Sequence, residues 1–232
     1  MVIRQRAIQA EDKQERHHAI LDAAERLLLR APDRVANVAE VADEAGLAKG
    51  TVYLYFPSKE ELLLAVHERN IDGYFRALIE RLQSDKPAAI GDVLALTHEH
   101  MVDPPLFLPL AARCFGQMGQ SMPPDAGIAF KQRMAQRLQA AGAGLERHFP
   151  ELEVGGGLAL LRYSYALILG LWQMSPAAQA HGAGCALTQG DSPSPVFDYS
   201  YPDELDRALT ALWEGTVGRR LASAVPSPEG RS

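Results

Sequence analysis

Small or hydrogen-bonding side chains gather on one short predicted helix near residue 50. They are Lys49, Gly50, Thr51, Tyr53 and Tyr55. Val52 and Phe56 lie four residues apart, so both can face inward while the polar groups face outward. A helix this short adds little to a core. Ammonium and hydroxyl groups on its outer face are suited to binding the phosphates and base edges of nucleic acid.

A second short helix is predicted directly before it. Its apolar residues recur at three- and four-residue spacing, and they are Val38, Val41, Ala42 and Ala45. Gly46 ends this helix, because glycine adopts the left-handed conformation at a helix end without steric cost. Leu47 can then pack between the two helices. Two short helices around a glycine turn predict a helix-turn-helix, whose second helix enters the major groove of DNA.

This motif resembles the tetracycline-repressor (TetR) family of bacterial transcription regulators. The resemblance rests on Val41-Ala-Asp-Glu-Ala-Gly-Leu-Ala-Lys-Gly-Thr-Val-Tyr-Leu-Tyr-Phe56 and on the following Ser58-Lys59-Glu60-Glu61-Leu62-Leu63, and it covers roughly residues 14–66. It implies that the outer face of the second helix lies against operator DNA. The residues implied are Lys49, Gly50, Thr51, Tyr53, Tyr55 and, on a phosphate, Lys59.

Two positions depart from the family pattern. Val38 stands where a threonine often contacts phosphate, and Ala48 stands where a serine often caps the recognition helix. We expect Asn37 to cap the earlier helix instead, and we count it with the DNA-binding residues.

The charge pattern lacks a basic footprint for DNA. Residues 1–69 hold ten Lys or Arg against twelve Asp or Glu, and the whole chain has a formal net charge of −6. We therefore expect few phosphate contacts and weak non-specific binding. Arg4 and Arg6 stand on an N-terminal arm, residues 1–12, that we expect to be flexible.

No stretch alternates as a strand, so the predicted fold is all-α, with an N-terminal three-helix helix-turn-helix DNA-binding domain and a larger helical ligand-binding and dimerisation domain. The expected domains are 13–58 and 59–222, with a long loop at 175–202 and a disordered tail at 223–232. The first helix ends before Pro32, and a rod-like helix from Lys59 to about Ser84 belongs to both domains. Further helices are predicted at 88–102, 105–119, 125–148, 152–174 and 203–222.

A homodimer is expected, because one short recognition helix contacts only a few base pairs. Two helices of the larger domain carry stripes resembling the family's four-helix dimer interface. The stripe on 152–174 consists of Ala159, Tyr163, Ala166 and Gly170, and the stripe on 203–222 consists of Leu205, Leu209, Leu212 and Thr216. Packing inside one subunit would produce the same pattern, and the stripes do not distinguish the two.

Proteins resembling this family usually bind a small molecule between the helices of the second domain, in an apolar pocket with a few polar anchors. The candidate ligand-binding residues are His98, Met101, Arg113, Gln117, Met118, Phe130, Met134, Tyr165 and Trp172. Their methionines and aromatic rings predict a small hydrophobic or aromatic ligand.

The residue pattern favours neither a metal site nor an enzyme. His98 and His100 stand two residues apart on a predicted helix and point in different directions, so one metal ion does not easily take both, and we expect no metal or cofactor. Cys114 lacks a surrounding catalytic motif, so no enzyme is predicted. An enzyme or metal-binding helical protein is the least favoured alternative.

We predict a homodimeric repressor that binds a palindromic operator and is released by the ligand. Control by a protein partner or by cysteine oxidation is the alternative. The charged N-terminus lacks the apolar segment of a secretory signal, and the apolar run from Leu158 to Met174 is interrupted by Arg162, Ser164 and Gln173. A cytoplasmic protein without membrane contact is therefore expected.

Overall fold

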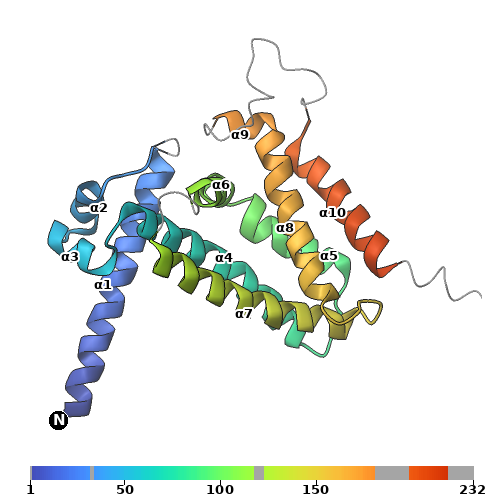
Figure 1. Cartoon of the computed structure of the whole chain (residues 1–232), viewed down its shortest axis with the longest axis horizontal. Coiled ribbons are helices and arrows are strands. Elements are labelled where there is room, and N and C mark those ends of the chain that lie inside the picture. The colour runs from blue at the N-terminus through green and yellow to red at the C-terminus, as the bar shows by residue number, and fades with distance from the viewer. Residues whose placement is uncertain (1, 32–33, 118–122, 181–198, 219–232) are drawn as a thin grey trace, which may run out of the picture.

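The computed structural model describes residues 2–31, 34–117, 123–180 and 199–218. These ranges hold helices and no strand, so the predicted all-α class is confirmed (Figure 1). The helices are α1 (Val2–Arg30), α2 (Val38–Ala45), α3 (Lys49–Tyr55), α4 (Lys59–Gln83), α5 (Ile90–Thr97), the π-helical turn η1 (His98–Val102), α6 (Phe107–Gln117), α7 (Pro124–His148), α8 (Gly156–Met174), α9 (Pro176–Ala180) and α10 (Tyr201–Val217). None of the described helices is long and apolar enough to cross a bilayer.

The first helix begins earlier than expected. Residues 2–12, predicted as a flexible arm, are part of α1, whose N-terminal half projects from the body of the molecule (Figure 1). No glycine or proline occurs in Val2–Arg30, and Ala, Arg, Gln and Glu are good helix formers, so no local signal stops the helix at residue 12.

The helix-turn-helix unit has its own apolar core. Its buried side chains from α1, α2 and α3 and their ends are Ile20, Leu21, Ala23, Ala24, Leu28, Val38, Val41, Ala42, Val52 and Phe56. Leu106, Leu110 and Cys114, from the segment around α6, pack into the same core. The larger domain therefore contacts the DNA-binding unit through α6 as well as through the chain connection at α4.

Helix α4 contributes to both cores. Leu62, Leu63 and Val66 lie in the first core, whereas Ile71 and Leu78 lie in the second, among residues from α7, α8 and α10. Figure 1 shows α4 and α7 side by side between the helix-turn-helix and the α8–α10 pair, and the contacts between α4 and α7 agree with this arrangement. A displacement of α4 would thus affect both units.

Helices α7 and α8 approach each other through two glycines. A Cβ atom on Gly157 would lie 2.2 Å from the carbonyl oxygen of Gly142, so no side chain fits there. The turn between them contains Gly155 in the left-handed conformation, with φ of 85°. Glu146 of α7 accepts hydrogen bonds from the backbone N–H groups of Gly155, at 2.9 Å, and Gly157, at 3.1 Å. This carboxylate caps the N-terminus of α8.

The expected loop at 175–202 begins as helix α9, and its residues 181–198 lie outside the described part of the chain, as does the predicted tail at 223–232. At the end of the loop, Tyr199 donates a hydrogen bond to the carbonyl of Leu171 at 2.8 Å, and Tyr201 donates one to the carbonyl of Ile168 at 2.9 Å. These tyrosines therefore pack on α8 of their own subunit.

Candidate DNA interface and ligand cavity

The turn between α2 and α3 has the predicted geometry. Gly46 adopts the left-handed conformation with φ of 66°, and the N–H of Leu47 donates to the carbonyl of Ala42 at 2.9 Å. Asn37 caps α2, because its side-chain oxygen accepts from the N–H groups of Ala39, at 2.9 Å, and Glu40, at 3.1 Å. The Oδ1 atom of Asn37 is therefore engaged in capping α2, as expected, and contact of the Asn37 side chain with DNA stays a prediction.

Most of the predicted recognition residues are exposed on α3. Lys49, Gly50 and Tyr53 are exposed, and Thr51 is half-buried. The Lys49 ammonium lies 5.8 Å from the centre of the Tyr53 ring, a cation–π distance that aligns the two side chains. Tyr55 differs, because its half-buried ring lies 6.3 Å from the ring of His17 on α1. Tyr55 thus contributes to packing as well as to the outer face.

One exposed residue of α3 was missed by the sequence reasoning. Leu54 is 85% exposed, although leucine is normally buried in a small domain. The signal was available, because Val52 and Phe56 define the inner face and Leu54 falls between them. An apolar side chain here is suited to contact with the methyl group of thymine in the major groove.

The start of α4 presents a lysine beside a capped helix end. Ser58 caps α4 by accepting from the N–H of Glu61 at 3.1 Å. Lys59 follows with its side chain 57% exposed, and its ammonium lies 3.7 Å from a carboxylate oxygen of Glu60. This long contact holds the ammonium weakly, so the Lys59 side chain can reach an anionic group outside the protein.

Two of the three acidic side chains of α2 form ion pairs inside the unit. Glu44 accepts from Arg26 and from Arg30, each at 2.7 Å, and Glu40 accepts from Arg34 at 2.8 Å. These ion pairs engage the guanidinium groups of three arginines of the unit. They also reduce the repulsion that free carboxylates of α2 would exert on phosphates.

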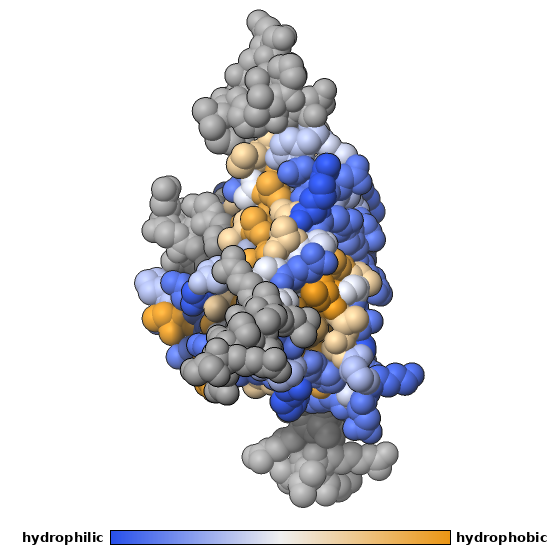
Figure 2. Space-filling view, turned by 90° about the vertical axis from the view of Figure 1, so that its right-hand side faces the viewer, coloured by the Kyte–Doolittle hydropathy of each residue, from blue (hydrophilic) through white to orange (hydrophobic). Residues whose placement is uncertain are grey.

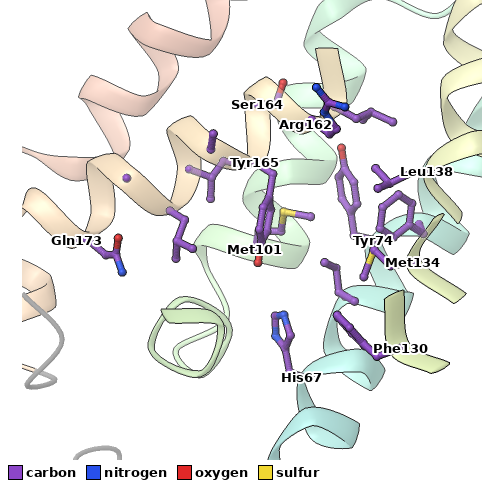
Figure 3. A pocket seen from close by; sticks show the side chains of 17 residues that line it. His67, Tyr74, Met101, Phe130, Met134, Leu138, Arg162, Ser164, Tyr165 and Gln173 are labelled. Carbon is purple, nitrogen blue, oxygen red and sulfur yellow. The ribbon is translucent and has the colours of Figure 1, made fainter. Parts of the chain in front are cut away.

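A cavity of about 480 Å³ lies between α4, η1, α7 and α8, within the size range of ligand pockets in proteins (Figure 3). Its wall is mainly apolar. The lining residues are His67, Ile71, Tyr74, Phe75, Met101, Phe130, Met134, Leu138, Leu161, Arg162, Ser164, Tyr165, Ala166, Ile168, Leu169, Gly170 and Gln173.

The structure places some predicted ligand residues in this wall and others elsewhere. Met101, Phe130, Met134 and Tyr165 line the cavity. The other five predicted residues lie outside the cavity wall or outside the described residues. The His98 side chain points to α10, and its Nε2 atom lies 2.6 Å from Oδ1 of Asp206. Trp172 is buried in the core, and Arg113 is half-buried outside the cavity wall. The Gln117 side chain and Met118 lie outside the described residues.

Helix α4 supplies cavity residues that the sequence reasoning did not select. His67, Ile71, Tyr74 and Phe75 repeat at helical spacing on one face of α4. The sequence signal for a cavity on this face was the polar His67 among apolar residues.

His67 is an unusual wall residue, because its ring is only 1% exposed. The centres of the Phe107 and Phe130 rings lie 5.6 Å and 6.4 Å from it. Among the described residues, Nδ1 of His67 has no hydrogen-bond partner. Burial lowers the pKa of His67 from 6.5 to about 4, so the ring is neutral near pH 7.

Some residues of the two predicted dimer stripes lie at the surface of the subunit, and others lie in its core. Figure 2 views the molecule from the side of α8 and α10, where apolar surface lies between polar borders. On α8, Tyr163 is 52% exposed, Ala166 is exposed, and Ala159 and Gly170 are half-buried. Ala166 and Gly170 also line the cavity.

On α10 the expectation was partly wrong. Leu205 and Leu209 are buried in the core of their own subunit, at 0% and 1% exposure, because this stripe of α10 packs against α8 and α5. Leu212 is half-buried, and Thr216 is exposed with its hydroxyl donating to the carbonyl of Leu212 at 2.6 Å. Only the last two residues of this stripe remain accessible to a partner.

The two histidines considered for a metal site are directed apart. His98 faces Asp206 of α10, whereas the His100 ring lies against Gly73 of α4. Within the described ranges, no three His, Cys, Asp or Glu side chains are grouped as metal ligands.

Comparison with known families agrees with both halves of this architecture. The family described as "Bacterial regulatory proteins, tetR family" matches residues 20–66, and "Tetracyclin repressor-like, C-terminal domain" matches residues 68–220. The chain therefore belongs to the TetR family. It is a transcription regulator with a helix-turn-helix DNA-binding domain and a helical C-terminal domain.

Curated relatives are similar over part of the chain. The fatty acid metabolism regulator protein of Bacillus subtilis is 34% identical over 86 residues, which cover 36% of this chain and 42% of that protein. The transcriptional regulator EthR of Mycolicibacterium smegmatis is 35% identical over 79 residues, covering 33% of this chain and 36% of EthR. The chain thus spans about two-fifths of the length of these relatives.

Solved structures share the fold over more of the chain. A TetR-family regulator from Mesorhizobium loti has a TM-score of 0.59 at 16% identity, covering 89% of this chain and 96% of that one. PfmR of Thermus thermophilus has a TM-score of 0.50 at 16% identity, covering 83% and 96% of the two chains. These likenesses establish the arrangement of helices.

Proposed function

We propose that this chain is a homodimeric repressor that binds a palindromic operator through α3 and leaves it when a small, mainly apolar molecule enters the cavity. Family membership supports DNA binding. The observation that carries ligand control is the position of three consecutive residues on α4, each of which faces a different part of the molecule.

His67 lines the cavity, and the next two residues join α4 to its neighbours. Glu68 accepts hydrogen bonds from Arg133, at 2.6 Å, and Arg137, at 2.8 Å, both on α7. Arg69 donates to Asp22 at 2.5 Å and also to Glu25, both on α1 of the DNA-binding unit. The cavity wall, α7 and α1 are therefore linked within one turn of α4.

This arrangement supports a mechanism in which the ligand shifts α4. A ligand that contacts His67 more favourably in one position of α4 stabilises that position, and Arg69 carries the shift to α1. Because the two recognition helices of a dimer must match successive major grooves, a changed separation lowers operator affinity. The ligand acts only through its different affinities for the two positions.

Control by oxidation of Cys114 has less support. Its thiol is buried in the core of the helix-turn-helix unit, with Sγ 3.9 Å from the carbonyl oxygen of Leu63. Burial raises the pKa of the Cys114 thiol to about 12, so the reactive thiolate is scarce near neutral pH. Cys185 lies outside the described residues.

The first experiment is a selection of genomic fragments bound by the purified full-length protein. A recovered palindrome near a promoter supports a dimeric regulator, and its affinity can then be measured by fluorescence anisotropy. Failure to enrich any sequence with a folded protein contradicts the proposal of operator binding.

Variants then test the docking of α3 and α4. We expect Tyr53→Ala to weaken operator binding strongly, and Lys59→Ala to weaken it across sequences and reduce the salt slope by about one. Lys86→Ala is the matched control, because Lys86 is an exposed lysine beyond the other end of α4. Unchanged affinity in both test variants would exclude this docking.

A further inference from the structure

A buried polar atom of the cavity wall, Nδ1 of His67, has no hydrogen-bond partner among the described residues. His67 is directed from α4 toward the space between α7 and α8 (Figure 3). Its neighbours Phe107 and Phe130 are hydrocarbon rings, and Nδ1 has no hydrogen-bond partner among the described residues. A buried polar atom is normally satisfied in a native protein, by the protein itself, by water or by a ligand.

Two other polar side chains of the wall already have partners. The Ser164 hydroxyl donates to the carbonyl of Leu160 at 2.8 Å and accepts from Nε1 of Trp213 at 3.0 Å. The Tyr74 hydroxyl interacts with the side chain of Thr97. Neither group needs a ligand for its hydrogen bond, whereas Nδ1 of His67 has no hydrogen-bond partner among the described residues.

The charge state of the wall decides which ligands fit beside His67. Burial keeps the ring neutral near pH 7, so it offers no positive charge to an anion. The cationic wall residue, Arg162, is exposed on α8. An anionic group placed at His67 would lose its hydration among aromatic side chains without a paired charge, which is strongly unfavourable.

We infer that the cavity takes an uncharged, mainly apolar molecule whose hydroxyl group hydrogen-bonds to His67, and that an anion of the same shape binds less well. This inference rests on the proposed function, because it names the ligand class for the same cavity. A neutral imidazole has one donor and one acceptor nitrogen, and a hydroxyl can both accept and donate. A hydroxyl therefore satisfies His67 in either tautomer.

Three probes of matched shape test this class on the full-length wild-type protein, by calorimetric titration at neutral pH without DNA. They are para-butylphenol, which is uncharged and carries a hydroxyl, para-butylbenzoate, which is anionic, and butylbenzene, which has no polar group. We expect para-butylphenol to bind about fivefold or more tightly than butylbenzene, and para-butylbenzoate to bind most weakly.

Two variants test whether His67 is the source of the preference for para-butylphenol over butylbenzene. His67→Phe keeps an aromatic ring but removes the hydrogen bond, so it should abolish the preference for para-butylphenol over butylbenzene. Met134→Leu changes an apolar wall residue at similar volume, so it should affect both probes alike. If His67→Phe does not fold, the comparison of the three probes on the wild-type protein still decides.

Several results would overturn the inference. They are equal affinities of para-butylphenol and butylbenzene, absence of para-butylphenol binding, or tightest binding by para-butylbenzoate. In the last case, loss of that binding in Arg162→Gln would identify an anion site at Arg162. Operator release is measured separately, so a preference for para-butylphenol with no effect of any probe on the DNA complex would support the ligand class while contradicting ligand-controlled release.

Discussion

Arg133 of α7 donates from Nε and Nη2 to the two carboxylate oxygens of Glu68 on α4, each at 2.6 Å. Arg137 adds a hydrogen bond to Glu68 at 2.8 Å and one to Asp72 at 3.0 Å. Burial alone would raise the pKa of Glu68, but the hydrogen bonds from both arginines lower it on balance, so the carboxylate stays ionised. Since α4 and α7 both line the cavity, these contacts hold two of its walls together.

Removing this carboxylate should loosen the contact between the two helices. We expect Glu68→Gln to lower the free energy of unfolding by about 1–2 kcal/mol, because charge-assisted hydrogen bonds to two arginines are lost. Urea unfolding measures the change. Glu204→Gln is the control, since Glu204 pairs with Arg207 on an exposed face and should cost less than about 0.5 kcal/mol. Equal effects of the two substitutions would contradict a special role for Glu68.

The buried His67 predicts a pH dependence of stability. Burial lowers its pKa from 6.5 in the unfolded chain to about 4 in the folded protein. Between these values the unfolded state binds a proton that the native state does not, so stability falls as the pH falls, by up to about 1.4 kcal/mol per pH unit. Above pH 6.5 the contribution of His67 is constant.

Urea unfolding at several pH values between 4 and 6.5 tests this dependence. His67→Phe should remove the His67 part of the slope. A wild-type slope equal to that of His67→Phe would show that His67 is protonated or exposed in the native protein.

The crossing of α7 and α8 predicts a sharp difference between two glycines. Gly157→Ala places a Cβ atom 2.2 Å from the carbonyl oxygen of Gly142, so the helices must separate, and we expect a loss of about 2 kcal/mol or more. Gly91→Ala is the control, because its Cβ meets nothing within 4 Å and alanine favours helix. Thermal unfolding compares them. A stable Gly157→Ala protein would mean that the helices are more loosely packed.

Leu54 predicts apolar recognition within the operator. We expect Leu54→Ala to weaken binding about three- to tenfold and to relax specificity at one A·T position, since a thymine methyl contact is lost. Anisotropy with operators altered one base pair at a time measures both effects. Leu29→Ala, at a leucine of α1 that is 50% exposed, should leave affinity unchanged. A uniform loss across all operators would indicate that Leu54 acts without base specificity.

The stripe of α8 formed by Ala159, Tyr163, Ala166 and Gly170, which is exposed at Tyr163 and Ala166, predicts where two subunits meet. Gly170→Leu adds a bulky side chain at an open position, and we expect it to shift the dimer toward monomer by at least tenfold in the dissociation constant. Gly170→Ala should leave the dimer intact because the added group is small. Analytical ultracentrifugation distinguishes the two. A dimer unaffected by leucine would place the interface elsewhere.

The helix-turn-helix was predictable because its determinants are local. Gly46, the apolar spacing of α2 and the cap at Asn37 act within one or two turns of the chain, so neighbouring residues decide the conformation. Glycine and proline positions likewise located most helix ends in the larger domain. The start of the first helix was not predictable, because no residue in Val2–Arg30 signals an interruption and α1 extends through residues 2–12.

The cavity and the partner-facing surfaces depended on contacts between distant residues. His67 is buried only because Phe107 and Phe130, from two later helices, close around it. Leu205 and Leu209 form a stripe that suits a partner subunit or the protein's own core equally well, and only the packing of α10 on α8 assigned them to the core. Helical periodicity tells which side chains share a face, but burial of that face depends on which helix covers it.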